Sequence, residues 1–274
     1  MKKILGAIAA LAMTVGLAAC GTPVSQGTAN QNQLVVGMEA GYPPFNWTQK
    51  DDSNGAVKIQ GTDQYAGGYD VEIAKRVAKQ LGKELVIVKT EWDGLTPALV
   101  SGKIDAIIAG MSPTEERKAT IDFTDSYYDS QLVLVVKKGS KYANATSLAD
   151  FAGAKVTAQL NTFHYSVIDQ IPGVEKQAAM DNFPAMRVAL QAGTIDAYVS
   201  ELPEAISAQA ANSDFVMVKL TDGFKVSPED IQTAVGVKKD SPLTKQINEA
   251  LKTISSEERQ KIMEEAIKNQ PAAE

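Results

Sequence analysis

A nine-residue frame occurs twice in the chain and limits the folds that it can adopt. ALVSGKIDA spans residues 98–106 and ALQAGTIDA spans residues 189–197, so both follow the pattern A-L-x-x-G-x-I-D-A. In each copy a helical pattern ends at a glycine suited to a C-cap, Gly102 or Gly193, and an apolar strand starts at Ile-Asp-Ala. The repeat predicts two α/β lobes of similar build, each of roughly 100 residues.

Short β-rich runs alternate with amphipathic stretches from Gln33 onward, as in α/β proteins with largely parallel sheets. Strands are predicted at 34–38, 85–89, 104–109, 132–137, 155–159, 174–179, 195–200, 215–220 and 233–239. Apolar residues at helical spacing, with Asp70 near the start and Gly82 past the end, predict a helix within 68–82. Polar segment 50–66 is expected to form a surface hairpin. Further helices are expected at 95–102, 184–193, 201–212, 241–254 and 256–270.

The first 19 residues are typical of an export signal. Lys2 and Lys3 precede an uncharged apolar run that ends in LAAC with the only cysteine, Cys20. LAAC resembles the lipobox of bacterial lipoproteins, in which the cysteine is diacylated; a free buried cysteine is the alternative. We expect a lipoprotein signal peptide at 1–19. The segment 20–33, rich in Gly, Ser, Thr, Asn and Gln, is expected to be a flexible tether.

The composition suits a globular protein and argues against several classes of function. The chain has 274 residues, 44% hydrophobic and 22% charged, enough for one large domain or two ordinary ones. Its net charge of -6 becomes -8 without Lys2 and Lys3, which argues against nucleic acid as a partner. A single cysteine excludes an intramolecular disulfide. With one histidine, His164, a zinc or hydrolytic site lacks groups, so no metal or cofactor is expected.

The two copies of the frame diverge past their shared part, where ligands bind in open α/β sheets. The first copy continues into AGMSPTEER. There Gly110 allows close approach of a ligand, Ser112 offers a hydroxyl, and Arg117 can hold a carboxylate through two hydrogen bonds. A surface arginine paired with Glu115 or Asp122 is the alternative.

The second copy ends in Glu201, just before Pro203 opens a helix. A carboxylate at a helix start is common because the helix dipole favours it. The functional alternative is that Glu201 faces Arg117 across a cleft. Together the two charges would hold the ammonium and the carboxylate of one zwitterion.

A third candidate element, GMEAGYPPFNW, directly follows the first predicted strand. Tyr42, Phe45 and Trp47 supply aromatic surface that belongs either to the core or to a site. Glu39 lies at the end of the strand, and an acid beside an apolar strand needs a partner.

The chain resembles the family 3 extracellular solute-binding proteins, the amino-acid receptors of ABC importers. The resemblance rests on GGYDVEIAKRVAKQLG, GLTPALVSGKIDAIIAGMSPTEERKATIDFTDSYY and AGTIDAYVSE, and spans about residues 34–269. It implies a type II periplasmic-binding-protein-like fold, with two lobes that close over a ligand. Two hinge-crossing strands near 129–132 and 231–234 would join a lobe of residues 34–130 and 232–274 to one of residues 131–231.

The resemblance implies that Arg117 holds the α-carboxylate of the ligand, with the Ser112 backbone and the Thr162 amide. The α-ammonium would bind the Gly110 carbonyl, the Ser112 hydroxyl and Glu201, where many relatives have aspartate. Asn161 stands where many relatives have glycine, so its backbone is expected at positive φ, which asparagine tolerates.

The ligand side chain would lie between the rings of Tyr42 and Trp92, with its polar end near Glu39. This arrangement suits a cation and favours arginine or lysine; glutamine is the alternative, because Glu39 can also accept a hydrogen bond from an amide. Further ligand-contacting positions are expected at Ala109, Met111 and Gln159.

Two other classes of protein, enzymes and sensor ectodomains, are alternatives to a binding protein. The same fold hosts dehydratases that use a cleft carboxylate, here Glu201 or Glu39, as a proton donor. A sensor ectodomain would need a spanning helix or a fused domain. The expected protein is not an enzyme but a monomeric binder, lipid-anchored to the extracytoplasmic side of the cell membrane, whose permease and ATPase are separate chains.

Overall fold

The computed structural model describes residues 32–271, all within one compact unit, Gln31–Glu274. The predicted signal peptide, Cys20 and almost all of the predicted tether lie outside the described residues. Among the described residues, no helix is long and apolar enough to cross a membrane.

The unit contains fourteen strands and eight α-helices in the described range. The strands are β1 Gln33–Met38, β2 Gly41–Tyr42, β3 Asn46–Gln49, β4 Val57–Lys58, β5 Tyr65–Gly67, β6 Glu84–Lys89, β7 Ala106–Ile107, β8 Asp122–Asp129, β9 Leu132–Lys137, β10 Lys155–Thr157, β11 Glu175–Lys176, β12 Ala197–Glu201, β13 Phe215–Val218 and β14 Gln232–Val237. The helices are α1 Tyr69–Gln80, α2 Trp92–Ser101, α3 Glu115–Lys118, α4 Phe163–Val167, α5 Phe183–Ala192, α6 Leu202–Ala211, α7 Leu243–Lys252 and α8 Ser256–Asn269.

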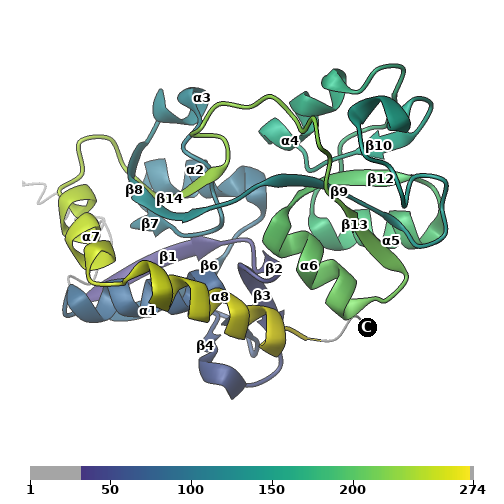
Figure 1. Ribbon diagram of the computed structural model, residues 1–274. Coiled ribbons are helices and arrows are strands. Elements are labelled where there is room, and N and C mark those ends of the chain that lie inside the picture. Colours follow the sequence, from purple (N-terminus) through teal and green to yellow (C-terminus); the bar gives the residue numbers. More distant parts are fainter. Residues whose placement is uncertain (1–31, 272–274) are drawn as a thin grey trace, which may run out of the picture. The chain divides into compact units, whose positions relative to one another are not determined.

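Two five-stranded sheets share one topology (Figure 1). The first has the order β6-β1-β7-β14-β8 and the second the order β11-β10-β12-β9-β13. In each, three parallel strands are followed by an antiparallel strand that enters from the other half of the chain. We call the elements around the first sheet lobe 1 and those around the second lobe 2. The two-lobed fold expected from the repeat is confirmed.

The repeated frame forms the same αβ unit in both lobes. Helix α2 ends at Gly102, with φ 80°, and α5 ends at Gly193, with φ 74°, so both glycines cap a helix in the left-handed conformation. The predicted helix ends are confirmed.

The aspartate of the frame has one role in both sheets. Asp105 accepts a hydrogen bond from the Val35 N–H at 2.9 Å, and its own N–H donates to the Val35 carbonyl at 2.8 Å. Asp196 is bonded in the same way to Lys155, at 2.9 and 2.8 Å. The carboxylate replaces one rung of the ladder, so each strand begins only at the following alanine. This is why the strand predicted to start at residue 104 begins only at Ala106; it ends at Ile107.

The chain crosses between the sheets twice. Strand β8 of the first sheet leads through Ser130 and Gln131 into β9 of the second, and β13 leads back to β14. The Ser130 N–H donates to the Ile231 carbonyl at 2.8 Å, so the two crossings lie side by side. The lobe limits 34–130 with 232–274 and 131–231 stay a prediction.

Strand β8 and the segment 50–66 differ from the expectation. No strand was predicted at Asp122–Asp129, because Thr124 and Tyr127 are its two buried residues and stand three apart, and register shifts with β14 break the alternation. Segment 50–66 is a hairpin only in part: β4 pairs with β5, and a short 3-10 helix, Ser53–Gly55, precedes them.

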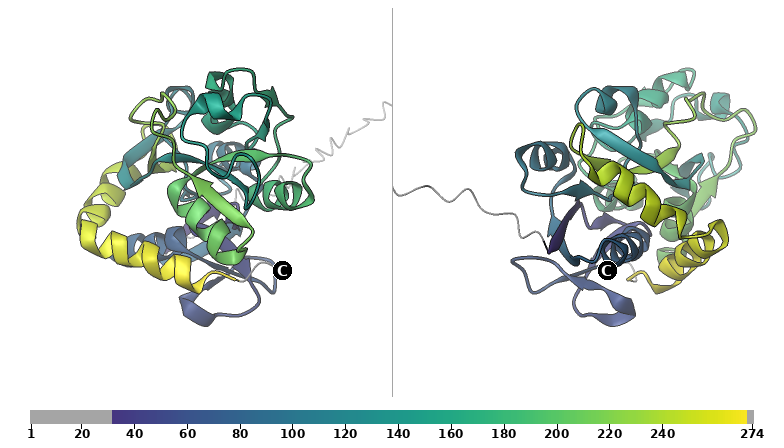
Figure 2. Two further views of the ribbon diagram at one scale, coloured as in Figure 1. Left: turned by 45° about the vertical axis from the view of Figure 1, so that its right-hand side comes forward. Right: turned by 90° about the vertical axis from the view of Figure 1, so that its left-hand side faces the viewer.

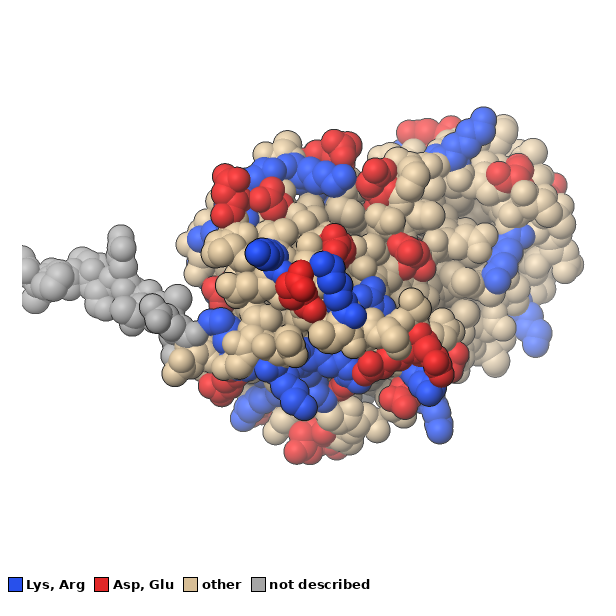
Figure 3. Space-filling view, turned by 60° about the vertical axis from the view of Figure 1, so that its left-hand side comes forward, with Lys and Arg blue, Asp and Glu red and all other residues tan. Residues whose placement is uncertain are grey.

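Helix α8 connects the lobes outside the two crossings (Figure 2). Its Glu258 accepts from Arg76 of α1 in lobe 1 at 3.0 Å. At its end, Gln270 accepts a hydrogen bond from the Ser207 hydroxyl of α6 in lobe 2, and its amide donates to the Ser207 carbonyl. On the face drawn in Figure 3, side chains of both charge signs are interspersed.

Candidate functional site

The lobes meet at a cavity of about 10 Å³, roughly the space of one water. A wider hollow of about 730 Å³ opens beside it. The cavity is lined by Tyr42, Trp92, Gly110, Ser112 and Arg117 from lobe 1, and by Gln159, Thr162, Phe163, His164 and Phe183 from lobe 2. Seven of these ten residues belong to the predicted site.

Arg117 reaches this cavity from α3, whose first turn is capped by the Thr114 hydroxyl. Its guanidinium donates to the carbonyl of Ser112 at 3.0 Å and, across the cleft, to the carbonyl of Asn161 at 3.2 Å. It also lies over the ring of Trp92, 5.0 Å from the centroid. Burial lowers the pKa of Arg117 to about 10, so the group is charged at neutral pH. Neither predicted surface partner, Glu115 or Asp122, pairs with it.

Gly110 is held at the cavity by a buried hydrogen-bond chain. Its N–H donates to the Tyr127 hydroxyl at 3.1 Å, which donates to Asp70 at 2.8 Å. Asn46 donates to the other oxygen of Asp70 at 2.8 Å. Gly110 has φ 62°, and an added Cβ would lie 2.7 Å from the ring of Tyr42, so only glycine fits. Burial raises the pKa of Asp70 to about 7 despite these donors.

Replacing Tyr127 with phenylalanine is expected to lower the free energy of unfolding by about 1–3 kcal/mol, because it leaves one oxygen of Asp70 and the Gly110 N–H without a buried partner. Urea unfolding followed by circular dichroism measures this change. Tyr128→Phe is the matched control and should cost less, because Tyr128 is only partly buried. If Tyr127→Phe and Tyr128→Phe are equally stable, the hydrogen-bond chain through Tyr127 does not support the loop at Gly110.

Glu201 ends β12 and is the N-cap residue of α6, with 1% of its surface exposed. Its Oε1 lies 3.2 Å from Nε2 of His164, whereas its Oε2 is buried without a hydrogen-bond partner. Nδ1 of His164 is likewise buried and unpartnered, and the buried Tyr42 hydroxyl lies close to Glu201. Burial, with the charge of Glu201, raises the pKa of Tyr42 well above its usual value. These free polar atoms are suited to a polar ligand.

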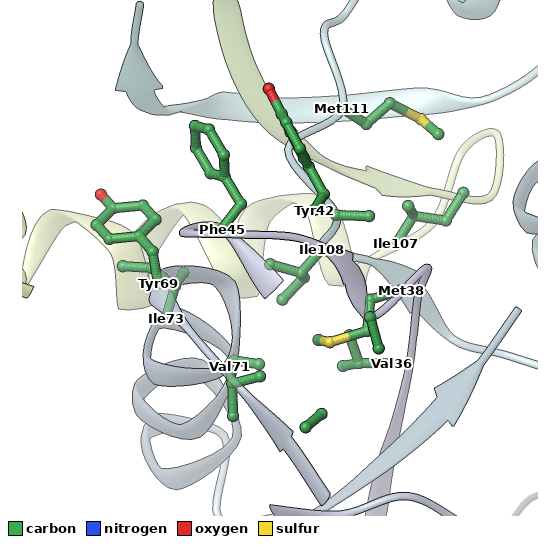
Figure 4. Close-up of a cluster of buried hydrophobic side chains, with 14 of the residues drawn as sticks. Val36, Met38, Tyr42, Phe45, Tyr69, Val71, Ile73, Ile107, Ile108 and Met111 are labelled. Atoms are coloured by element: carbon green, nitrogen blue, oxygen red, sulfur yellow. The ribbon is translucent and has the colours of Figure 1, made fainter. Parts of the chain in front are cut away.

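Both rings of the predicted aromatic sandwich, Tyr42 and Trp92, line the cavity. Tyr42 stacks between Phe45, at 4.9 Å, and Phe183 of lobe 2, at 4.4 Å. Trp92 instead faces Arg117. Figure 4 shows Tyr42 and Phe45 side by side above the apolar core. Phe45 and Trp47 are buried in this core, which favours the structural alternative for both residues.

Glu39, at the end of β1, is 5% exposed and accepts hydrogen bonds from the amide of Gln159 of lobe 2 at 3.1 and 3.3 Å. Burial raises the pKa of Glu39 to about 7. Glu39 lines a separate hollow of about 360 Å³, shared with Lys89 and Glu91, whereas Gln159 lines the cavity. The Glu39–Gln159 pair thus closes one end of the cavity.

Asn161 has φ 54°, which confirms the expected positive φ. Its side chain donates to Asp93 of lobe 1 at 2.9 Å, and this adds a further interlobe bond. The neighbouring Thr162 is the N-cap residue of α4, and its hydroxyl donates to the Gln159 carbonyl at 2.7 Å.

Three other predicted residues, Ala109, Met111 and Ser112, are buried and bonded in different ways. Ala109 is buried in the lobe 1 core. Met111 is also buried (Figure 4), borders the wider hollow and accepts from the Ala234 N–H at 3.0 Å. The Ser112 hydroxyl donates to the Asp230 carbonyl at 2.8 Å, so it can offer only its lone pairs to a ligand.

Phe163, His164 and Phe183 were missed as site residues. Phe163 and His164 directly follow the predicted Thr162, and Phe183 precedes Pro184 at the start of α5. All three lie at the start of a helix that follows a strand, where ligands bind in α/β folds, and this position could have indicated a role in the site.

A family model, bacterial extracellular solute-binding proteins, family 3, matches residues 34–269. The chain is 29% identical over 265 residues to the arginine-binding extracellular protein ArtP of Bacillus subtilis, covering 92% of each chain. It is 31% identical over 290 residues to the ABC transporter glutamine-binding protein GlnH of the same organism, covering 99% of this chain and 100% of GlnH. A structure of the amino acid ABC transporter substrate-binding protein AbpA of Streptococcus pneumoniae, bound to L-arginine, superposes with a TM-score of 0.74 at 28% identity, covering 87% of this chain and 95% of AbpA.

Proposed function

The chain belongs to the bacterial extracellular solute-binding proteins, family 3, and from this membership we propose that it captures L-arginine or L-lysine for an ABC importer. It is an amino-acid ABC transporter substrate-binding protein. The preferred amino acid, the lipid anchor and the delivery to a permease are the parts that we propose.

One observation carries the assignment of the site: the buried guanidinium of Arg117 lines the interlobe cavity, and the buried carboxylate of Glu201, which does not line it, is paired with His164, which does. Arg117 of lobe 1 forms no ion pair with any described residue and is bonded only to carbonyls. Glu201 of lobe 2 keeps one buried oxygen without a partner. A zwitterionic amino acid supplies a carboxylate for the first and an ammonium for the second.

The ligand would enter after the lobes separate. The interlobe hydrogen bonds of Arg117 with Asn161, Asn161 with Asp93 and Gln159 with Glu39 must then break, since the cavity is too small for an amino acid. On closure the ligand takes the place of some of these bonds and stabilises the shut form, which the permease would recognise. Binding and closure are therefore coupled.

Glu39 supports a cationic side chain as the ligand's far end. Its carboxyl is buried beside the cavity, and among residues 32–271 its hydrogen-bond donor is the neutral amide of Gln159. An arginine or lysine side chain would supply the missing positive charge, and the stacked Tyr42 and Phe183 would cover its apolar stem. The relatives include both arginine-binding and glutamine-binding proteins, so glutamine is the second candidate.

A thermal-shift screen of the twenty amino acids, followed by calorimetry, tests this function. Arginine or lysine should raise the melting temperature most. If no amino acid does so, the proposed ligand class is wrong. The same samples, assayed for products, test the dehydratase alternative: turnover of a carboxylic substrate would contradict a pure binding role.

Affinity for a cationic ligand is expected to rise from pH 5 to about pH 7 and then level off. Glu39, with a pKa of about 7, must lose a proton to form the ion pair, so below pH 7 the affinity changes by up to about tenfold per pH unit. Glu39→Gln should remove this part of the slope and weaken arginine binding by roughly 10- to 100-fold, while glutamine binding changes little.

Glu91→Gln is the matched control, because Glu91 lines the same hollow as Glu39 but is exposed. It should leave both ligands unaffected. Arginine affinity that is unchanged in Glu39→Gln would instead favour a neutral side chain as the ligand.

The lipid anchor at Cys20 is proposed from the LAAC sequence. In cells, the wild-type protein should partition with membranes and Cys20→Ser should not, as followed by detergent-phase separation. Partition of both forms into the aqueous phase would overturn the anchor without bearing on amino-acid binding.

A further inference from the structure

His164 and Glu201 form a buried pair on one lobe. The ring nitrogen Nε2 lies 3.2 Å from Oε1 of Glu201, with 5% and 1% of the two residues exposed. Both belong to lobe 2, at the start of α4 and the end of β12, so opening of the cleft does not separate them. The ring lines the cavity and packs on Phe163, at 4.3 Å, and on the edge of Phe183, at 6.5 Å.

Each member of the pair keeps one polar atom free. Oε2 of Glu201 and Nδ1 of His164 are buried without partners. In a neutral imidazole that donates from Nε2, Nδ1 is an acceptor. The pair then presents two acceptors, one of them fully charged, which suits a primary ammonium with its three N–H donors. When both ring nitrogens carry protons, Nδ1 becomes a donor and the ring becomes a cation.

Few other charges act on the ring. On β12, Glu201 is its only charged contact, and on the adjoining 3-10 helix Asp169 is exposed and paired with Lys176 at 2.9 Å. Glu204 is compensated by Arg187 at 2.8 Å. From lobe 1, Arg117 and Tyr42 line the same cavity. Beyond these, Asp70 is buried behind Gly110, and Glu39 lies behind Gln159.

We propose that His164 is a positioning residue of the ammonium subsite, whose neutral ring holds Glu201 in place and whose protonated ring competes with the ligand's ammonium for that carboxylate. The proposal rests on the proposed role of Glu201 in amino-acid binding. It couples binding of the ammonium to the neutral form of the ring, and it restricts the subsite to ligands with a free α-ammonium. This effect of His164 on ligand binding is separate from the effect of Glu39, because Glu39 is proposed to contact the ligand's side chain.

Calorimetry from pH 5 to 8 tests this proposal in the Glu39→Gln background, which removes the titrating group at the side-chain end of the site, while Asp70 stays the same in every variant compared. With arginine as the probe, the affinity should still depend on pH in this background, because a protonated ring competes with the ligand's ammonium for Glu201. Titrations in buffers of different ionisation enthalpy should register proton release. Adding His164→Gln keeps an N–H donor for Glu201 but cannot titrate. It should weaken binding several-fold at pH 8 and abolish both the pH slope and the proton release.

Two further variants separate the possible outcomes. Asp169→Asn, near His164 but exposed, should leave the slope in place. Glu201→Gln should lower affinity at every pH. A slope that persists in His164→Gln overturns the role of His164 and leaves the proposed function standing. Normal binding by Glu201→Gln overturns the ammonium subsite, and with it the proposal. The ammonium subsite is also overturned if the des-amino analogue of arginine binds as tightly as arginine itself.

Discussion

Arg117→Ala is expected to weaken amino-acid binding by about 10³-fold, which would abolish the thermal shift at millimolar ligand. Two charge-assisted hydrogen bonds to a carboxylate contribute about 1.5–3 kcal/mol each, and the variant also leaves the ligand carboxylate without a counter-charge in a closed cleft. Isothermal calorimetry at pH 7.5 measures the loss. The melting temperature of the ligand-free variant should change little, because Arg117 is bonded only to two carbonyls and to one ring.

Lys118→Ala is the matched control on the same short helix. Its ammonium pairs with the exposed Glu115 at 2.9 Å and does not line the cavity. Affinity should therefore stay at the wild-type level. Arg117→Lys should recover only part of the affinity, because an ammonium cannot form two parallel bonds. If Arg117→Ala binds the amino acid with full affinity, the ligand's carboxylate does not bind at Arg117.

Arg187→Met is expected to lower the free energy of unfolding by about 3–5 kcal/mol, because it leaves the buried carboxylate of Glu204 without its counter-charge. Arg187 donates to Glu204 at 2.9 Å and to the Ser207 hydroxyl at 3.1 Å, and Glu204 has no exposed surface. Tyr198 and Ser200 also donate to Glu204. Urea unfolding of the ligand-free protein measures the change.

Two further variants identify the cause of this loss. Adding Glu204→Gln to Arg187→Met removes the unpaired charge but keeps an acceptor for Tyr198 and Ser200, so part of the stability should return. Lys176→Met breaks an ion pair whose acid is 70% exposed and should cost less than about 1 kcal/mol. Equal losses in Arg187→Met and Lys176→Met would contradict the role of burial.

Much of the fold could be predicted from local pattern. The α/β order, the helix ends at Gly102 and Gly193 and most strands follow from periodicity and caps, which depend on neighbouring residues. Strand β8 could not be predicted, because its register shifts with β14 remove the two-residue alternation. The function of the repeated aspartate was not visible either, because its partners, Val35 and Lys155, lie on other strands.

The surroundings of the two candidate charges could not be predicted from the sequence. Arg117 and Glu201 were singled out because the two copies of the frame diverge there. The stacking of Tyr42 on Phe183 and the pairing of Glu201 with His164 were not expected. The first joins the two lobes, and the second joins α4 to a strand end 37 residues away in the chain.

The sequence by itself determined a twice-built α/β unit and its helix caps, and its resemblance to a known family implied the positive φ of Asn161. These features depend on short-range sterics and periodicity, which a linear pattern records. Only the tertiary structure decided which side chains meet at the cavity. Those contacts depend on how the two sheets bring distant segments together, and it is there that Glu201 pairs with a histidine and Arg117 bonds to the carbonyls of Ser112 and Asn161.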